Sequence, residues 1–594
     1  MGSMAGRGVR RPVVWSVILL LLILACAAWV GVRAYLAQQE IAASEQHAKA
    51  VHESMAKGDA AGARASASQL ASHATAARGY MSDPLWQGAS LLPLVGVNFS
   101  TASTLADVLA DVATEAVVPL SEASATFTPA SLKPEAGMLD LAALEAARPA
   151  VGRAAGVVQD ARRRVAALEP GGGTVPQLRD AMDRLASLLG TASGQLSAVD
   201  TAGLVLPDML GASGPRTYLV LFQNNAELRA TGGIPGAVAE LHASRGKLTL
   251  GRQAAAKDFP KFPEPVLPLA AQTQGLYGAI TGQYFQDVNL APQFPLSARL
   301  AAQMWKQHYG VDVDGVVSID PVALSYLLKA TGPVELASGE RLSSDNAVQV
   351  LLSDSYAEYS GTAKDDYFAS AAAAVFSKLS SGVFQPRAMV EALGQAARER
   401  RLLAWSPQAK EQDAIKAAGM DGWFPDQTPG RGVFAVYLND ATGGKMGYYL
   451  RESYTVGGAM CRDDGRPTWE VAVTLTNTAP PDAATSLPRY VTGAGNFGVS
   501  PGSVKTQVNV YAPPSGVFVG AWRGTEHLDV HRDMDSGYPV AQADSLLGPG
   551  QSSTLRFQFV GAPGTDTDPD LISTPTINAP VISNTPLSCE NLVR

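Results

Sequence analysis

The stretch RTYLVLFQNNAELRATGGIPGAVAELHASRGKLTLGRQ, residues 216–253, decides the fold class of the central part of the chain. It begins with an apolar run that ends in polar Gln-Asn-Asn, a pattern typical of a buried strand followed by a loop. GAVAELHAS and KLTLGRQ flank Arg245-Gly246 and are predicted to be two short strands joined by a turn. Further along, helical and strand patterns alternate to about residue 410. This alternation predicts a layered α/β domain over residues 213–410.

The α/β domain contains five predicted helices and one further strand, DGVVSID. The helix PVALSYLLKATG starts at Pro321, and Asp320 is its expected N-cap because a carboxylate there can accept from free backbone N–H groups. The last predicted helix is PRAMVEALGQAARERRLL, which would extend to Leu403. The other three predicted helices are SARLAAQMWKQHY, SDNAVQVLLSDSYAEY and DDYFASAAAAVFSKLSSG.

An uncharged apolar stretch near the N-terminus, PVVWSVILLLLILACAAWVGV, spans residues 12–32. It is long enough to cross a hydrocarbon core of about 30 Å as a helix. Three arginines precede it and only Arg33 follows closely, which places the N-terminus in the cytoplasm and the rest outside. A cleaved signal peptide is the alternative, because Ala25-Cys26-Ala27 resembles a cleavage site. The apolar run continues past that site, and this favours a retained anchor.

The segments on either side of the α/β domain have different compositions. Residues 37–212 are rich in good helix formers, but their apolar residues are small and sparse, so we expect a helical stalk or thin bundle. From about residue 430, short runs rich in β-branched and aromatic residues are separated by Gly, Pro and Asp. Their spacing predicts a C-terminal β-sandwich within residues 411–594, with one last edge strand supplied by the tail.

The overall composition excludes several functional classes. Hydrophobic residues make up 46% of the 594 residues and charged residues 17%, and the net charge is −8. This balance excludes a disordered chain, and it offers no basic face for nucleic acid. Three cysteines exclude a disulfide scaffold and a CxxC zinc site. Cys461 and Cys589 lie in the outer part, where one disulfide is favoured over two free thiols.

The strongest candidate site follows the first strand of the α/β domain. Its charged residues are Glu227 and Arg229, and Arg252 ends the neighbouring strand. Two arginines suit a phosphate or pyrophosphate, because a guanidinium can pair with two anionic oxygens at once. Amides and glycines would add side-chain and backbone donors, namely Asn224, Asn225, Gly232 and Gly233. The alternative is structural: Arg229 would pair with Glu227 or Glu240 and tie down a loop.

A second cluster lies in DVNLAPQFPLSARLAAQMW, residues 287–305. In the structural interpretation, the oxygens of Asp287 and Asn289 cap the following helix. In the functional interpretation, Asp287 binds Mg²⁺, which prefers oxygen ligands and often bridges phosphate oxygens. A motif further along the chain, VYLNDATGGKM, would bring Asn439, Asp440 and Lys445 onto the α/β domain. The alternative for that motif is a buried strand and loop at a domain interface.

Three segments, FQNNAELRATGGIPG, DVNLAPQFP and VYLNDATGGKM, resemble the hallmarks of domain-of-unknown-function family 4012. The resemblance covers roughly residues 80–590. It implies a membrane-anchored bacterial envelope protein, of a kind often associated with exopolysaccharide genes, with no established reaction. On this basis we expect a single-pass protein of the bacterial cytoplasmic membrane, comprising a cytoplasmic tail (1–11), a signal anchor (12–36), a stalk or bundle (37–212), an α/β domain (213–410) and a sandwich domain (411–594).

A more distant likeness concerns YGVDVDGVVSIDPVALSYLLKATGPVEL, residues 309–336, which is similar to a segment of the LytR-CpsA-Psr family. That family transfers glycopolymers from a polyprenyl pyrophosphate carrier to the cell wall, with Mg²⁺ and an arginine cluster on the pyrophosphate. The likeness implies that Arg229 and Arg252 hold phosphates and that Asp287 holds magnesium. The later arginines of that family have no counterpart in this sequence. Where the family has an Arg-Gln pair, this chain has only one cationic residue, Lys364.

The resemblances leave two functions open. The first is phosphotransfer of a polyprenyl-pyrophosphate-linked glycan to the wall, for which three expected arginines are missing. The second is non-enzymatic: an envelope-assembly or adhesion protein that binds glycan. In both, the expected partners are the bilayer, through one helix, and an envelope glycan or its lipid-linked intermediate. The phosphotransfer hypothesis requires Arg229, Arg252 and Asp287 to converge on one pocket in the folded chain.

Overall fold

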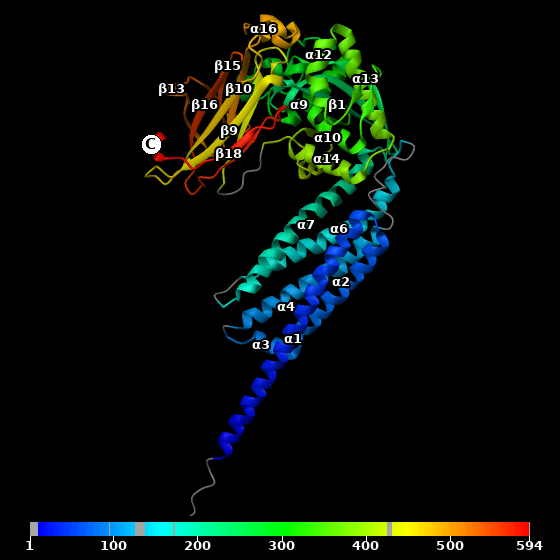
Figure 1. The fold of residues 1–594 in the computed structure, drawn as a ribbon, viewed down its shortest axis with the longest axis vertical. Helices are drawn as coiled ribbons and strands as arrows, with labels where there is room; N and C mark the ends of the chain where they lie inside the picture. Colours follow the sequence, from blue (N-terminus) through cyan, green and yellow to red (C-terminus); the bar gives the residue numbers. More distant parts are fainter. Residues whose placement is uncertain (1–9, 94, 125–136, 170–172, 425–430, 593–594) are drawn as a thin grey trace, which may run out of the picture. The chain divides into compact units, whose positions relative to one another are not determined.

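The computed structural model describes residues 10–93, 95–124, 137–169, 173–424 and 431–592 (Figure 1). The chain divides into two compact units. The first comprises residues 1–132 and 140–207, and the second comprises residues 133–139 and 208–594. The predicted cytoplasmic tail, 1–11, lies almost wholly outside the described residues. The predicted divisions at 212/213 and 410/411 stay predictions, and the second of them falls inside the second unit.

The first unit is helical throughout its described residues. Its helices are α1 (Arg10–Lys57), α2 (Ala60–Met81), α3 (Pro84–Ser90), α4 (Gly96–Asp111), a π-helical turn (Val112–Val117), α5 (Val118–Ala123), α6 (Leu141–Ala166) and α7 (Pro176–Met209). Small side chains let α1 and α2 approach closely, because Ala37 of α1 and Ala63, Ala67 and Ala74 of α2 are completely buried. An alanine-rich sequence therefore forms a bundle with little large apolar core.

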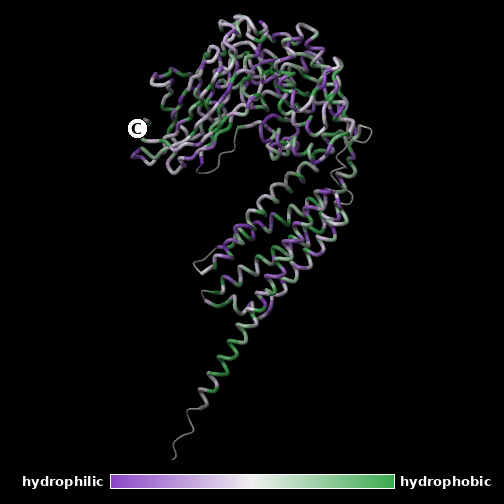
Figure 2. Tube along the Cα trace, in the orientation of Figure 1, coloured by the Kyte–Doolittle hydropathy of each residue, from purple (hydrophilic) through white to green (hydrophobic). Residues whose placement is uncertain are grey.

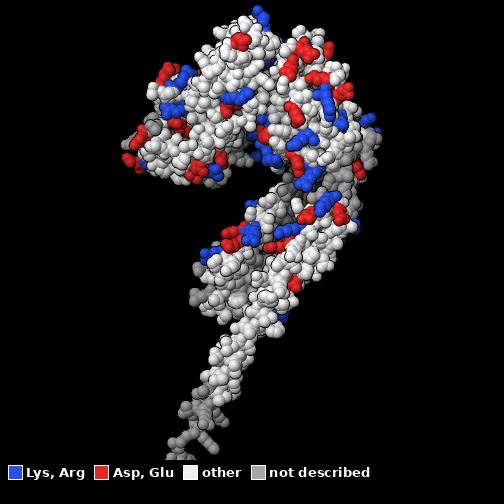
Figure 3. All heavy atoms as spheres, in the orientation of Figure 1, with Lys and Arg blue, Asp and Glu red and all other residues white. Residues whose placement is uncertain are grey.

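The first half of α1 is apolar and exposed on all sides. Large side chains between Val14 and Leu24 are about half exposed, and Figure 2 colours this part of α1 as hydrophobic. In Figure 3 the described part of this apolar stretch shows no Lys, Arg, Asp or Glu side chains. Among the described residues, α1 is the one helix long and apolar enough to cross a membrane. It is consistent with a single-pass anchor, because such a surface is stable in hydrocarbon and not in water.

The second unit contains a mixed five-stranded sheet with strand order β3-β2-β1-β4-β7. Its strands are β1 (Arg216–Arg229), β2 (Gly232–Ser244), β3 (Lys247–Ala255), β4 (Gly315–Ile319) and β7 (Leu402–Trp405). β1 is antiparallel to β2 and parallel to β4. The main helices are α8 (Ala271–Tyr277), α9 (Phe294–Tyr309), α10 (Pro321–Thr331), α13 (Gly361–Ser380), α14 (Pro386–Arg398) and α15 (Ala409–Ala417), with short turns α11 (Ala347–Gln349) and α12 (Ser355–Glu358).

Helices cover both faces of this sheet. Leu219 and Leu221 of β1 share a hydrophobic cluster with Phe294 and Trp305 of α9. On the other face, Ile319 of β4 packs against the α10 and α14 cluster. The α/β interpretation from sequence therefore holds as layers of helix and sheet. As predicted, Asp320 caps α10, accepting a hydrogen bond from Ala323 N at 2.7 Å.

Two local expectations for this sheet are wrong. Gln-Asn-Asn does not begin a loop, because β1 continues to Arg229 and pairs across a bulge with Gly232 and Gly233. The bulge absorbs the polar residues without ending the strand. The last predicted helix stops at Arg398, and Leu402-Leu403 starts β7, where pairing with β4 overrides the local helix preference.

A small sheet pairs β5 (Val334–Glu335) with β6 (Arg341–Leu342), and two larger sheets complete the second unit. One has the order β13-β12-β16-β10-β9-β18 and the other β14-β15-β11-β8-β17. Their strands are β8 (Val433–Asp440), β9 (Leu450–Ala459), β10 (Thr468–Asn477), β11 (Val504–Tyr511), β12 (Val517–Arg523), β13 (Glu526–His527), β14 (His531–Asp535), β15 (Tyr538–Leu547), β16 (Ser552–Val560), β17 (Asp570–Ser573) and β18 (Val581–Asn584). Residues from both sheets, such as Val436 and Phe557, share one hydrophobic cluster.

Strand β8 is buried on both faces. Alternate residues point to opposite sides, so Phe434 and Val436 face the cluster shared by the two sheets. Ala435 and Tyr437 face the cluster around α9 of the α/β layer. The β8 sheet is therefore packed directly against the α/β part of the same unit, and the loop after β8 is positioned at that junction.

The C-terminal segment supplies two edge strands, one more than expected. β17 pairs in parallel with β8, and β18 pairs in parallel with β9. Cys461 and Cys589 form a disulfide, with their Cα atoms 5.4 Å apart, which is the pairing favoured by the sequence. The bond links the end of the chain to the segment that follows β9.

Candidate functional site

A chain of buried ion pairs joins β1 to two later segments. Arg229, at the end of β1, donates to Asp287 Oδ1 at 3.0 Å and lies 3.5 Å from Glu227 Oε1. Lys445, in the loop after β8, pairs with the other oxygen of Glu227. All four side chains are at least 87% buried. The sequence motifs of β1, of residues 287–295 and of residues 436–446 therefore meet at one point.

Two further residues of the later motif fasten it to the α/β layer. Asn439 Oδ1 accepts from Ala230 N at 3.0 Å, and its amide donates to Leu290 O at 3.1 Å. Asp440 accepts from the backbone N–H groups of Thr442 and Gly443 at 3.1 and 2.8 Å. Asn439 and Asp440 therefore hold the strand end and its loop in place, as the interface interpretation of this motif expects.

Burial and charge act in opposite directions on these carboxylates. Burial raises the pKa of Glu227, but Lys445 and Arg229 outweigh it and the pKa lies below its ordinary value. Burial, with the nearby charge of Glu227, raises the pKa of Asp440 to about 6. Burial also raises the pKa of Asp287, against the opposing effect of Arg229. Glu227 is the firmly ionised partner of the two cations.

A pocket of about 200 Å³ opens beside Glu227 and Lys445. We call it the Tyr490 pocket, and its lining residues are Glu227, Gly443, Gly444, Lys445, Arg489, Tyr490, Gly493 and Asn496. The Tyr490 ring is 54% exposed, and the ammonium of Lys364 lies 3.7 Å from its centre. Arg229 is not among the lining residues. The pocket lining thus combines an exposed tyrosine, the cations Lys445 and Arg489, and the paired carboxylate of Glu227.

The glycines that line this pocket are needed for backbone packing. Gly443 has a φ of +68°, and a Cβ there would lie 2.1 Å from the Phe497 ring. A Cβ on Gly444 would lie 2.5 Å from Val491 O. These contacts press the loop after β8 against residues 491–497 and so form one wall of the pocket.

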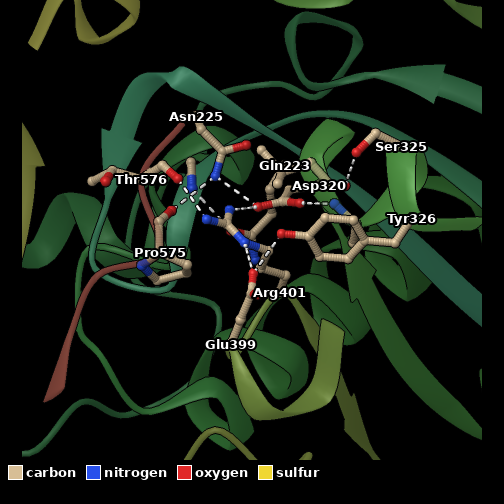
Figure 4. A network of polar contacts seen from close by, with 12 residues as sticks. Gln223, Asn225, Asp320, Ser325, Tyr326, Glu399, Arg401, Pro575 and Thr576 are labelled. Carbon is tan, nitrogen blue, oxygen red and sulfur yellow. Dashed lines mark hydrogen bonds and ion pairs between the residues drawn. The ribbon is translucent and has the colours of Figure 1, made fainter. Parts of the chain in front are cut away.

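Asn225 of β1 points into a different network, which is buried around Asp320 and Arg401 (Figure 4). Asn225 donates to Asp320 Oδ2 at 2.9 Å and to Pro575 O at 3.0 Å. Arg401 donates to the same Asp320 oxygen at 2.7 Å and to Thr576 O at 2.7 Å. The network joins β1, α10 and the C-terminal segment. Asn225 therefore supports the fold and does not face the Tyr490 pocket.

The remaining predicted binding residues also have internal partners. Asn224 is hydrogen-bonded to the Tyr356 hydroxyl. Asn289 donates to Thr231 Oγ1 and to Gly233 O at 2.9 and 2.8 Å. It does not cap the next helix, which starts at Phe294 with Gln293 as its N-cap. A Cβ on Gly233 would lie 2.1 Å from the Asn224 backbone, so this glycine permits the close bulge of β1 against β2.

Arg252 does not join Arg229 and Asp287. It lies on β3 with an exposed side chain, and its guanidinium stacks over the Tyr309 ring at 4.4 Å. The sequence test for a phosphotransferase required these three residues to converge. The structure brings Arg229 and Asp287 together and places Arg252 in another environment.

The residues around Asp287 do not fit a magnesium site. The nearest charged partner of its carboxylate is the Arg229 guanidinium, which would repel a second cation. The neighbouring carboxylate, Glu227, already pairs with both Arg229 and Lys445. Within the described ranges, no group of three His, Cys, Asp or Glu side chains is arranged to hold a metal ion.

Sequence reasoning missed Arg489, Tyr490 and Asn496. They come from two short helical turns, α17 (Arg489–Thr492) and the 3₁₀ turn Gly493–Gly495, that lie between β10 and β11. The residues GAGNFG, 493–498, match the letters of a dinucleotide loop but form turns. Arg489-Tyr490 stands two residues before this Gly-rich stretch, and the spacing matches no binding motif.

A family model described as a protein of unknown function (DUF4012) matches residues 213–356. These residues belong to the DUF4012 family. The resemblance drawn from the sequence is thereby confirmed for the range that holds Glu227, Arg229 and Asp287. The DUF4012 match ends at Tyr356, so Lys445 and Tyr490 reach this domain from outside the matched range. No curated protein and no solved structure matched the chain.

Proposed function

We propose that this chain is a membrane-anchored bacterial envelope protein that binds an anionic glycopolymer outside the cytoplasmic membrane and does not turn it over. The proposal takes the second of the two functions considered from the sequence. It places glycan recognition at the Tyr490 pocket. The anchor is α1, with the N-terminus inside and the two folded units outside.

The observation that carries the proposal is the character of the Tyr490 pocket. An exposed aromatic ring offers a flat apolar face for the C–H face of a sugar, and its hydroxyl offers a hydrogen bond. Arg489 lines the pocket next to Tyr490 and supplies positive charge for a carboxylate or phosphate on the polymer. Lys364 lies over one face of the ring and adds a second positive charge there, which leaves the other face for a sugar. Asn496 adds an amide that can both donate and accept. Such a mixture suits a charged sugar better than a purely apolar ligand.

The ion pairing of Arg229 argues against the transferase alternative. Phosphoryl transfer relies on cations aimed at the phosphate oxygens. Both terminal nitrogens of Arg229 are engaged inside the protein, by Leu228 O and by Asp287. Arg252 stacks on Tyr309 instead of facing the same point. A transferase of the LytR-CpsA-Psr kind would therefore lack its arginine cluster here.

The same proposal covers the finer fold assignments. We interpret the helix-covered mixed sheet as a LytR-CpsA-Psr-like layer that has kept the architecture and lost the arginines. We interpret the two sheets that share one core as the predicted β-sandwich. In this interpretation the sandwich contributes Lys445, Arg489 and Tyr490 to a binding pocket at the edge of the layer.

The test is glycan binding by pocket variants. The full-length protein in lipid nanodiscs is titrated with the anionic glycopolymer released from the envelope of the bacterium that makes the protein. Binding is followed by calorimetry. Arg489→Ala combined with Tyr490→Ala should weaken binding at least tenfold. Both side chains are exposed, so the fold should be unaffected.

Arg299→Ala, on an exposed arginine that is not among the pocket lining residues, is the matched control and should bind as wild type. Equal binding by all three proteins would refute the pocket assignment.

A further inference from the structure

The first unit contains a long segment without any charge. Residues 84–106, PLWQGASLLPLVGVNFSTASTLA, carry no Asp, Glu, Lys or Arg. Those of them that the structure describes, 84–93 and 95–106, form α3, the turn after it and most of α4. In a surface segment of a protein surrounded by water, a stretch of this length would normally carry charges.

The start of this segment is fixed to the outer end of the apolar stretch in α1. Asp83 caps α3 by accepting from Leu85 N at 2.9 Å. The same carboxylate accepts from Trp29 Nε1 at 3.3 Å and from Arg33 at 3.0 Å. Trp86 is buried in a cluster with Ala37 of α1. Figure 1 shows α3 beside α1, in agreement with these contacts.

Several large apolar side chains of the segment are exposed. Leu85 is 43% exposed, Leu91 85%, Leu92 53% and Val95 47%. We call these four residues the α3 apolar patch. Contiguous exposed apolar groups on a soluble surface usually mark a contact with a protein or a membrane.

We propose that the α3 apolar patch lies in the headgroup boundary of the outer leaflet, beside the point where α1 leaves the bilayer. Asp83, directly before the segment, ties its start to Trp29 and Arg33, at the end of the exposed apolar stretch of α1. A tryptophan and an arginine at the end of a span are typical interface residues. A short element with outward leucines, no charge and a buried tryptophan on its other side suits an interfacial position.

The inference deepens the proposed function, and it rests on α1 being the membrane anchor. Its consequence is that the helical unit contacts the bilayer at two places, α1 and the patch. Two contacts restrict the tilt of the first unit on the membrane more than the single span of α1 would.

Depth-dependent fluorescence quenching tests the inference on the full chain in liposomes. A Cys26→Ser background removes the one free cysteine of the described chain and leaves the disulfide oxidised. Single cysteines at Leu92, Leu20 and Glu53 are then labelled with an environment-sensitive dye. Glu53 is exposed on the same helix as Leu20, about 36 Å beyond Trp29 at ~1.5 Å per residue.

The three positions separate the possible outcomes. We expect the dye at Leu92→Cys to be blue-shifted, quenched by a spin label near the lipid headgroups and protected from aqueous iodide. Leu20→Cys should be quenched by a spin label deep in the acyl chains, and Glu53→Cys by iodide alone. If Leu20→Cys is in lipid but Leu92→Cys is quenched by iodide, the patch inference is wrong and the anchor stands. If Leu20→Cys is also quenched by iodide, the anchor itself fails.

Discussion

Arg229 at the end of β1 and Asp287, 58 residues further along the chain, are joined by a buried hydrogen-bonded ion pair of 3.0 Å. This contact bears on the two functions that the sequence left open, phosphotransfer and non-enzymatic glycan binding. An arginine held for phosphate would face a pocket, whereas Arg229 lies behind Glu227 and is neutralised by acidic side chains. Its main effect is to tie two DUF4012 motifs together.

The first prediction concerns the stability of this pair. Arg229→Met should lower the free energy of unfolding by ~3–5 kcal/mol, because it leaves the buried Asp287 carboxylate without its cation. Asp287→Leu should lower it by less, because Arg229 keeps Glu227 as a partner at 3.5 Å. The double variant should lose clearly less than the two single losses added together. Denaturant unfolding followed by tryptophan fluorescence measures all three values. An Arg229→Met protein of normal stability that fails to bind glycan would instead make Arg229 a binding residue.

Arg252 should behave differently from Arg229. Its side chain is exposed and its contact is a cation–π stack on Tyr309, so Arg252→Ala should cost only about 0.5–1 kcal/mol. Glycan binding should be unchanged, since Arg252 is not among the residues that line the Tyr490 pocket. The same unfolding and calorimetric experiments test both statements. A glycan-binding defect in Arg252→Ala would show that Arg252 is part of the binding site.

The third prediction is a pH dependence caused by Glu452. Burial raises the pKa of this carboxyl to about 8, with a hydrogen bond from Thr576 opposing the shift. Between an unfolded pKa of 4.5 and a folded pKa of about 8, the folded state holds a proton that the unfolded state has lost. Stability therefore falls as the pH rises through this window, by ~5 kcal/mol in total.

Glu452→Gln separates this effect from the other titrating groups. Gln keeps the shape and cannot ionise, so the variant should lose the decline between pH 5 and pH 8 of about 1.4 kcal/mol per pH unit. Melting temperatures of wild type and variant, measured across that range, give the comparison. Parallel pH profiles would show that Glu452 is ionised in the folded protein.

The fourth prediction concerns the disulfide. Cys461 and Cys589 are 128 residues apart, so their bond removes much freedom from the unfolded chain. Cys461→Ser with Cys589→Ser should cost ~2–5 kcal/mol. It should also release the tail that carries β18, which limited proteolysis would detect. Reductant should reproduce the effect in wild type and add nothing in the variant; an unchanged digestion pattern in both would mean that β18 holds without the bond.

The fold could be predicted where the local pattern and the tertiary packing agree. The apolar stretch of α1, the cap at Asp320, the turn at Arg245-Gly246 and strands such as β8 and β10 are all determined by neighbouring residues. Leu402-Leu403 was misassigned because its strand identity depends on β4, which lies more than 80 residues earlier. The polar end of β1 was misassigned because the alternation of apolar and polar residues along a strand does not reveal a bulge against Gly232-Gly233.

The site was predicted in part for the same reason. Motifs identified the meeting of Arg229, Asp287 and Lys445, since each motif combines charge with glycines or prolines. The structural alternative considered for Arg229, pairing with Glu227, is what the structure shows. The second partner, Asp287, was not predicted, because ion pairing across 58 residues depends on which segments fold together. Tyr490 was missed because a lone Arg-Tyr in a turn carries no spacing signal, and its exposure is a property of the folded chain alone.

The central claim is that the chain binds an anionic envelope glycan at the Tyr490 pocket and leaves it unchanged. The most direct measurement incubates the full-length protein in nanodiscs with the polyprenyl-linked glycan and a wall acceptor, and follows both bound and transferred glycan. We expect saturable binding by wild type and by Arg299→Ala, binding weakened at least tenfold in Arg489→Ala with Tyr490→Ala, and no transfer by any of them. Transfer of glycan to the acceptor by wild type, lost in Arg229→Lys, would contradict it.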